Sequence, residues 1–461
     1  MISKKPILLL FTLFAFFLHG QELDNRIFSY DEFMDAVKEH HPLAYQAELQ
    51  KQRGAAIMLA ARGGFDPILM GEIKQKYFEG KEYYSYIHGG LKVPTWYGIA
   101  LEAGYNNNRG EYLSDEATTP EEGLLNAGVS INLGKGLLMD KRRAEFQKGK
   151  IYLDLTIQEQ RLLLNDLFYR ASTAYVDWYV SFLKVRVYNS ALQNAKIRLA
   201  GIKESASLGD KPQVDTLKAF IQVQERELKL EQSLLDVINK KNALDVYLWQ
   251  DGFIPLELED GIEPLINGRL LDSTLTFNQS IDSIIEQHPD IIISKGKVDL
   301  SRIDLRLMRE NLKPEIQLKY NALSATNQLD EYDISNYTWG GSIKYPIFTR
   351  RARGEARLAN LELNQNKALF DSKKAEVRYK LFTAENNIYS TLQQNAMALK
   401  MVNSYASLFY AERTLFNAGE SSLFLLNTRE NQWIDAQVKQ IEIEKSHFEN
   451  KIYFFYQTFG F

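Results

Sequence analysis

Cysteine is absent from all 461 residues. Its absence excludes disulfides, thiolate metal sites and cysteine nucleophiles, and it is compatible with an oxidising compartment. The sequence also lacks the zinc-protease pattern His-Glu-x-x-His and the hydrolase pattern Gly-x-Ser-x-Gly. The glycine-rich stretch 133–136 lacks the spacing and the Lys-Ser/Thr pair of a phosphate loop. We therefore expect no enzyme activity, no cofactor and no metal site.

An excess of positive charge is lacking as well. The formal net charge is −4, and removing Lys4 and Lys5 with residues 1–20 would leave −6. An acidic chain gives no reason to expect nucleic acid as a partner. After residue 20, no apolar run reaches the roughly 20 residues that a membrane-spanning helix needs. Residues 1–20 have a basic start, a short apolar core and a small residue near the end, which predicts a secretory signal peptide.

Long rows of residues spaced seven apart are the main positive feature of the sequence. Such a repeat keeps one face of a helix against a neighbour and predicts coiled-coil packing. In the second half the rows predict an antiparallel hairpin over about 350–459, and in the first half over about 140–248. In the second half the rows are Val377, Ala384, Thr391 and Ala398 with Leu381, Ile388 and Val402, then Ile434, Ile441, Phe448 and Phe455 with Val438 and Ile452. In the first half they are Ile157, Leu164, Ala171 and Trp178 with Leu167 and Ala174, then Val214, Ile221, Leu228 and Leu235 with Leu217 and Ile238. Many members are small or polar, which is typical of a hairpin with water on one side.

Matched landmarks indicate an internal duplication. The pairs His41-Pro42 and His288-Pro289 lie 247 residues apart, as do Pro67 and Pro314. The two histidines are better explained as helix boundaries than as metal ligands. The glycines at the two hairpin turns, Gly209 and Gly419, lie only 210 residues apart. The first half therefore holds 37 more residues than the second, and we place this extra length between about 78 and 123.

The predicted division of the chain follows these landmarks. The first repeat covers 21–250, a belt rich in proline and glycine covers 251–274, and the second repeat covers 275–461. Each repeat contains two helices, strands, and a long helical hairpin.

The strand regions, about 66–134 and 314–348, alternate between apolar and polar residues. This pattern suits a membrane β-barrel wall with lipid on one side and water on the other, although a half-buried soluble sheet alternates in the same way. The second half offers two strands, and the first half offers two or four. Two strands in each half would give twelve in a trimer. Aromatic residues expected at the membrane interfaces are Tyr97, Tyr105, Tyr337, Trp339 and Tyr345.

The turn sequences resemble those of the TolC-like outer-membrane efflux protein family, also called outer membrane factors. Asp215 follows Gly209 by six residues and Ala219 follows it by ten, as in the family pattern; Leu425 and Arg429 replace this Asp and Ala in the second copy. The resemblance implies a mainly α fold with a β-barrel part, in which a trimeric 12-stranded barrel continues into an α-helical tunnel. It implies the outer membrane of a Gram-negative bacterium, with a periplasmic helical extension.

The resemblance also implies partners and a site. The partners are two further copies of this chain, outer-membrane lipid, a periplasmic adaptor protein and an inner-membrane transporter. The turns would form the periplasmic entrance and the adaptor-docking surface, with Gly209, Asp210, Asp215, Ala219, Gly419, Glu420 and Leu425. The expected function is a passive conduit of a tripartite efflux system for small molecules. The alternatives are the outer channel of type I protein secretion and a non-channel periplasmic coiled-coil scaffold.

Overall fold

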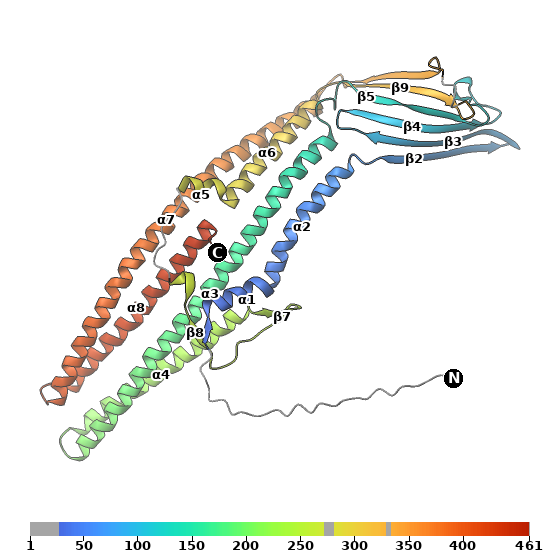
Figure 1. Ribbon diagram of the computed structural model, residues 1–461. Helices are drawn as coiled ribbons and strands as arrows, with labels where there is room; N and C mark the ends of the chain where they lie inside the picture. Colours follow the sequence, from blue (N-terminus) through green and yellow to red (C-terminus); the bar gives the residue numbers. More distant parts are fainter. Residues whose placement is uncertain (1–26, 272–280, 329–332, 461) are drawn as a thin grey trace, which may run out of the picture.

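The computed structural model describes residues 27–271, 281–328 and 333–460. The chain is elongated, with a β-sheet at one end and two helical hairpins at the other (Figure 1). The predicted signal peptide lies outside the described residues.

Two long hairpins form most of the molecule. The first consists of α3 (Lys141–Ser207, 67 residues) and α4 (Gln213–Asp245, 33 residues). The second consists of α7 (Arg350–Asn417, 68 residues) and α8 (Leu423–Thr458, 36 residues). At 1.5 Å per residue, α3 and α7 are each about 100 Å long. They occupy the two stretches in which the sequence predicted hairpins.

Shorter helices cover the parts of α3 and α7 nearer the sheet. These are α1 (Tyr30–His40), α2 (Pro42–Gly63), α5 (Ile281–Gln287) and α6 (Pro289–Glu310). Helix α2 lies along α3, and α6 lies along α7 (Figure 1). Each long helix therefore packs against one partner near the sheet and another near the tip.

Histidine side chains begin both second helices. The His41 ring accepts a hydrogen bond from the Leu43 N–H at 3.0 Å, and the His288 ring accepts one from the Asp290 N–H at 3.2 Å. Both rings are buried, and burial lowers the pKa of each. The helix-boundary interpretation of the two His-Pro pairs is confirmed.

Acidification should destabilise the fold through His288. Burial lowers its pKa from 6.5 to about 4. Above pH 6.5 the ring is neutral in both the folded and the unfolded chain. As the pH falls from 6.5 toward 4, the ring takes up a proton only in the unfolded chain, and the folded state therefore loses stability in this range. A shift of this size corresponds to about 3 kcal/mol. Urea unfolding in detergent at pH 7.5 and 4.5 measures the effect. A His288→Asn variant, which keeps a capping side chain, should show a smaller pH dependence; an unchanged dependence would contradict this assignment.

The largest core cluster lies where the belt meets the first hairpin. Tyr175 of α3 is fully buried there, and its hydroxyl donates to the Phe28 carbonyl at 2.6 Å and accepts from the Leu265 N–H at 3.0 Å. Burial raises the pKa of this phenol. Ile266 and Leu270 of the belt pack into the same cluster. Short strands complete it, namely β1 (Ile27–Ser29) parallel to β8 (Glu263–Leu265), and β6 (Trp249–Gln250) with β7 (Ile254–Pro255).

Six strands form the large sheet, in the order β10-β9-β5-β4-β3-β2, and all neighbours are antiparallel. The first half supplies β2 (Ile68–Phe78), β3 (Lys81–Pro94), β4 (Ile99–Arg109) and β5 (Leu124–Asn132); the second supplies β9 (Glu315–Ala325) and β10 (Tyr337–Lys344). The twelve-stranded expectation assumed four strands per chain, whereas the sheet has six. Strands β3 and β4 fall within the 78–123 interval to which the extra length was assigned.

The heptad rows differ in what covers them. On α7, Val377, Leu381, Ala384, Ile388, Thr391 and Ala398 are at most 8% exposed, as the sequence predicted. On α8, Ile434, Ile441 and Phe448 are buried. The row on α4 is different: Val214, Leu217, Ile221, Leu228, Leu235 and Ile238 are each between 46% and 61% exposed. The described part of the chain therefore leaves roughly half of each of these side chains exposed.

Candidate functional site

The two hairpin turns have the same backbone geometry. Gly209 and Gly419 adopt φ values of 85° and 81°, a left-handed conformation that strains other residues. The next N–H in each turn reaches back to the helix end, from Asp210 to the Ser205 carbonyl and from Glu420 to the Leu415 carbonyl, both at 2.9 Å. This pattern satisfies carbonyls that the helix end would leave unpaired. The turns are therefore built for a sharp reversal at each tip.

Four of the predicted entrance residues lie at the tips and are exposed, namely Gly209, Asp210, Gly419 and Glu420. Asp210 and Glu420 hold the same position in the two turns, each directly after its glycine. A cleft of about 580 Å³ separates the two tips, and Asp210 lines it.

The other three predicted residues lie on the return helices. Leu425 is exposed, whereas Ala219 is only 3% exposed and packs with Ile202 and Leu423 between the hairpins. Asp215 is mostly buried and pairs with Lys218 at 3.1 Å. The seven residues thus gather at one end of the molecule, but only five of them are exposed.

A buried ion-pair cluster joins the hairpins near these tips. Arg198 of α3 donates to both carboxylate oxygens of Glu430 in α8, at 2.8 and 2.7 Å, and to Asn427 at 2.9 Å. Arg226 of α4 lies 4.0 Å from the same carboxylate and hydrogen-bonds Asn431. Glu430 is 1% exposed, and burial lowers the pKa of Arg226. One carboxylate therefore ties together three helices of the two hairpins.

The sequence analysis did not identify this cluster. Its ionic partners, Arg198 and Glu430, lie 232 residues apart, so no local spacing reveals them. A signal was nevertheless present, because Glu430 stands on the same helix face as Leu426 and Ile434, four residues before and after it. A charged residue inside an apolar stripe indicates a buried partner.

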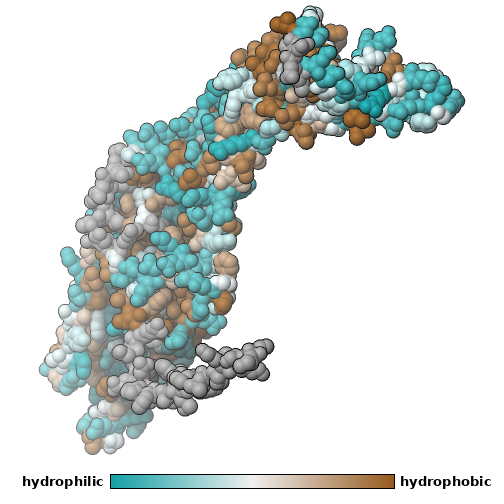
Figure 2. All heavy atoms as spheres, turned by 45° about the vertical axis from the view of Figure 1, so that its right-hand side comes forward, coloured by the Kyte–Doolittle hydropathy of each residue, from teal (hydrophilic) through white to brown (hydrophobic). Residues whose placement is uncertain are grey.

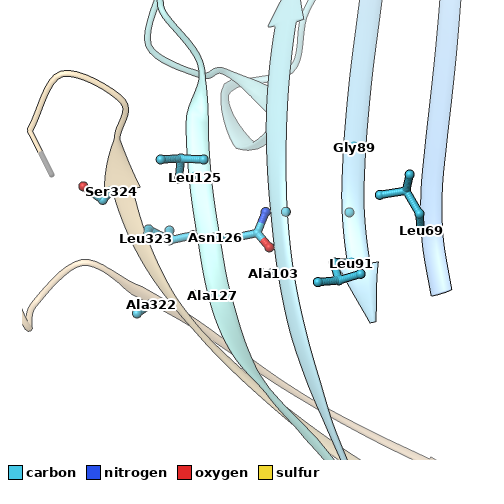
Figure 3. Close-up of a pocket in the computed structure, with 12 residues that line it drawn as sticks. Leu69, Gly89, Leu91, Ala103, Leu125, Asn126, Ala127, Ala322, Leu323 and Ser324 are labelled. Atoms are coloured by element: carbon cyan, nitrogen blue, oxygen red, sulfur yellow. The ribbon is translucent and has the colours of Figure 1, made fainter. Parts of the chain in front are cut away.

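The large sheet has one apolar and one polar face. On the apolar face, a groove of about 590 Å³ runs across the strands from β9 to β2 (Figure 3). It is lined mainly by Leu, Ala and Gly, including Leu69, Leu91, Ala103, Ala127 and Ala322. Figure 2 shows hydrophobic side chains over the part of the sheet nearer the helices and hydrophilic ones at its far end.

The opposite face carries a network of charges. Glu102 of β4 pairs with Lys92 of β3 at 2.8 Å and with Lys319 of β9 at 3.8 Å, and it accepts a hydrogen bond from Ser130 of β5 at 3.0 Å. On β2, Glu72 lies 3.8 Å from the His88 ring of β3. This ladder of polar contacts extends from β2 to β9.

The predicted interface aromatics divide into two groups. Tyr97, in the β3–β4 turn, and Tyr345, after β10, lie at the end of the sheet that adjoins the helices, and both are exposed. Tyr337 and Trp339 are exposed on β10, and Tyr105 is half-buried, with its hydroxyl donating to the Glu122 carbonyl at 3.0 Å. Their role at a membrane interface stays a prediction.

Among the described residues, no helix combines the length and hydropathy needed to cross a bilayer. The same residues contain no group of three or more side chains that could hold a metal ion.

Comparisons with known proteins agree with this arrangement. Residues 280–450 match the family model described as outer membrane efflux protein. No curated protein matches. Solved structures with a similar fold include the Campylobacter jejuni CmeC outer membrane channel, at 14% identity over 93% of this chain and 85% of that one, with a TM-score of 0.66.

Two further solved structures are similar. The outer membrane protein VceC of Vibrio cholerae is 13% identical over 93% of this chain and 95% of its own, with a TM-score of 0.66. The open state of the Neisseria gonorrhoeae MtrE outer membrane channel is 13% identical over 93% and 88%, with a TM-score of 0.64. The resemblance to the outer-membrane efflux protein family is therefore confirmed, in sequence over residues 280–450 and in fold over most of the chain.

Proposed function

We propose that three copies of this chain form an outer-membrane efflux channel, with the sheets in the membrane wall and the hairpins in a periplasmic tunnel. The observation that carries the proposal is the sidedness of the sheet. Apolar side chains such as Leu69 and Ile73 are 84% and 77% exposed on one face, and the charges pair on the other. Lipid would cover the apolar face, and water would fill the lumen behind the charged face. A soluble periplasmic scaffold would leave this apolar face in water.

The uncovered row on α4 supports assembly with further copies. Its apolar residues repeat every seven positions, as in a coiled-coil seam, yet the chain itself leaves them exposed. A helix from a second copy would bury them and close the gap between neighbouring hairpins.

The tips would meet the partners of a tripartite system. Leu208 and Phe424 are 71% and 73% exposed there, beside the two tight turns. Apolar side chains of this kind at a protein's end favour contact with another protein. We assign them to a periplasmic adaptor, which would connect the entrance to an inner-membrane transporter. The cargo would pass through passively, without chemistry.

The acidic residues of the turns should set the ion preference of the entrance. In a trimer, Asp210 and Glu420 would place six exposed carboxylates around it, whereas Asp215 is already paired with Lys218. Charges of one sign at a constriction raise the local concentration of the opposite ion. Replacing both, as Asp210→Asn with Glu420→Gln, should therefore lower the cation-to-anion permeability ratio several-fold in planar bilayers.

The matched control for this experiment is Asp215→Asn. We expect a smaller change, because Lys218 already compensates this carboxylate. A larger change from Asp215→Asn than from the double variant would reverse the assignment and make Asp215 the entrance acid.

Fractionation with native mass measurement tests the proposed function. The full chain, expressed in a Gram-negative host, should be found in the outer membrane and should have three times the chain mass after extraction in detergent. Recovery as a soluble monomer from the periplasm would overturn the channel and favour the scaffold.

A further inference from the structure

We propose that all six strands of each chain belong to the membrane wall, so that the trimer closes a barrel of eighteen strands. This inference rests on the proposed function and extends it. The extra hairpin, β3 with β4, is then a structural part of the wall and not an appendage at the cell surface.

The position of the extra hairpin carries the first argument. Strand β2 begins directly after Pro67 and β9 directly after Pro314, so the two strands correspond in the two halves. In the second half, β9 pairs with β10, the strand that leads into the long helix. In the first half, β3 and β4 lie between β2 and β5 and pair with both. The insertion therefore widens the sheet from within.

The lengths of the added strands fit a membrane. β3 has 14 residues and β4 has 11, against 11 in β2 and 9 in β5. A tilted strand needs about 9–11 residues to cross the hydrocarbon core. Strand β3 pairs with β4 over ten consecutive residues, from Ser85↔Arg109 to Pro94↔Ala100, without a register break.

The apolar face continues across the added hairpin. Ile87 and Leu91 of β3 and Leu101 of β4 are 44%, 42% and 49% exposed, on the same face as Val129 of β5 at 40%. The groove on this face likewise runs without interruption from β9 through β4 and β3 to β2 (Figure 3). A surface loop in water has no need of such a face.

The polar face continues across it too. His88 and Lys92 of β3 lie opposite the apolar residues, and Lys92 pairs with Glu102 of β4. Glu102 in turn reaches Lys319 of β9, a strand from the other half of the chain. The added strands thus share one lumen-side network with the rest of the wall.

The two outer edges of the sheet are suited to pairing with further copies. Every residue of β2 and of β10 is exposed, and within the described chain each of these strands has one strand neighbour in the sheet. Unpaired backbone groups cannot face lipid, so both edges need a partner. With six alternating strands the two edges run in opposite directions, so β10 of one copy and β2 of the next would pair antiparallel, as every other pair does.

The size of the opening follows from the strand number. Barrel diameter grows roughly linearly with the number of strands. Eighteen strands would give about 1.5 times the diameter of twelve, in the range of the porins that enclose a water-filled channel. The helical tunnel and its entrance, rather than the barrel, would then limit the size of the cargo.

Disulfide trapping tests the inference, because the natural chain contains no cysteine. A fixed cysteine, Gly341→Cys in β10, is combined with one cysteine on the same face of β2. A second series combines Gly341→Cys with cysteines on β4, which would be the wall's edge if β2 and β3 lay outside it. A third series combines Leu69→Cys of β2 with Leu125→Cys, Ala127→Cys or Val129→Cys of β5, because β2 would pair directly with β5 if β3 and β4 lay outside the wall. The β2 series is Leu69→Cys, Gly71→Cys, Ile73→Cys and Gln75→Cys, and the β4 series is Leu101→Cys, Ala103→Cys, Tyr105→Cys and Asn107→Cys.

Oxidation in outer membranes followed by a denaturing gel without reductant gives the result. At least one β2 position should convert most of the protein to covalent trimers, because neighbouring strands bring Cα atoms within disulfide distance. The β4 series should remain monomeric, and the β2–β5 pairs should form no disulfide within a chain, because two strands separate β2 from β5. Linkage through β4, a disulfide between β2 and β5, or no linkage through β2 in a chain that is trimeric by native mass would overturn the eighteen-stranded wall alone. A cysteine-free chain that is monomeric by native mass would instead overturn the proposed function.

Discussion

The double variant Ile221→Glu with Leu228→Glu is expected to lose the trimer. Both side chains belong to the exposed apolar row on α4, at 46% and 61% exposure in the single chain. If a neighbouring copy buries this row, each new carboxylate would lose its water without gaining a partner, which costs several kcal/mol. Association should then weaken by roughly two orders of magnitude or more. Native mass measurement in detergent would show monomers, and bilayers would show no conductance.

The control for this variant is Lys229→Glu, in the same helix and next to Leu228. Lys229 is exposed but points about 100° away from the row, since each residue of an α-helix turns by that angle. It changes the charge by two, yet the trimer should persist. A trimer that survives Ile221→Glu with Leu228→Glu would show that another surface holds the copies together.

The variant Glu430→Gln should strongly destabilise the hairpin tips. Within the described residues, Glu430 is the carboxylate that lies within 4.0 Å of both Arg198 and Arg226, so its loss removes the direct counter-charge of two guanidinium groups. Breaking a buried pair by removing one partner typically costs about 3–5 kcal/mol. Hydrogen exchange of the tip amides should rise accordingly, while the sheet and the belt should keep their protection.

Two comparisons separate this effect from a general one. Glu420→Gln makes the same chemical change on an exposed tip residue and should alter stability by about 0.5 kcal/mol or less. The double variant Arg198→Met with Glu430→Leu removes the principal pair together and should recover part of the loss, since apolar replacement of a buried pair is often tolerated. Equal protection in Glu430→Gln and in the natural chain would mean that the cluster contributes little.

Much of the helical fold could be predicted because its determinants are local. The rows at Val377 and Ile434 repeat every seven residues, and the turns at Gly209 and Gly419 have a glycine where the backbone needs a left-handed residue. The His-Pro pairs mark helix starts through hydrogen bonds that span two residues. The comparison of the two halves also placed the extra length correctly, within the stretch that forms β3 and β4.

The remaining features depend on contacts between distant residues. Alternation of apolar and polar residues identified the strand regions, but it does not say which strands pair. The sequence also left the number of strands in the first half at two or four, and the sheet order shows four. Periodicity showed that Leu228 belongs to an apolar row, but not that the chain itself leaves this row exposed. The pairing of Arg198 with Glu430 is invisible for the same reason, because it requires two hairpins to be docked side by side.

Single-channel recording tests the central claim most directly. The full chain, purified in detergent and added to a planar bilayer, is expected to insert as trimers and to give discrete, uniform conductance steps. Ile221→Glu with Leu228→Glu should give none under the same conditions. A natural chain that inserts or binds without any conductance, at concentrations where native mass shows the trimer, would contradict the account of this protein as a conduit.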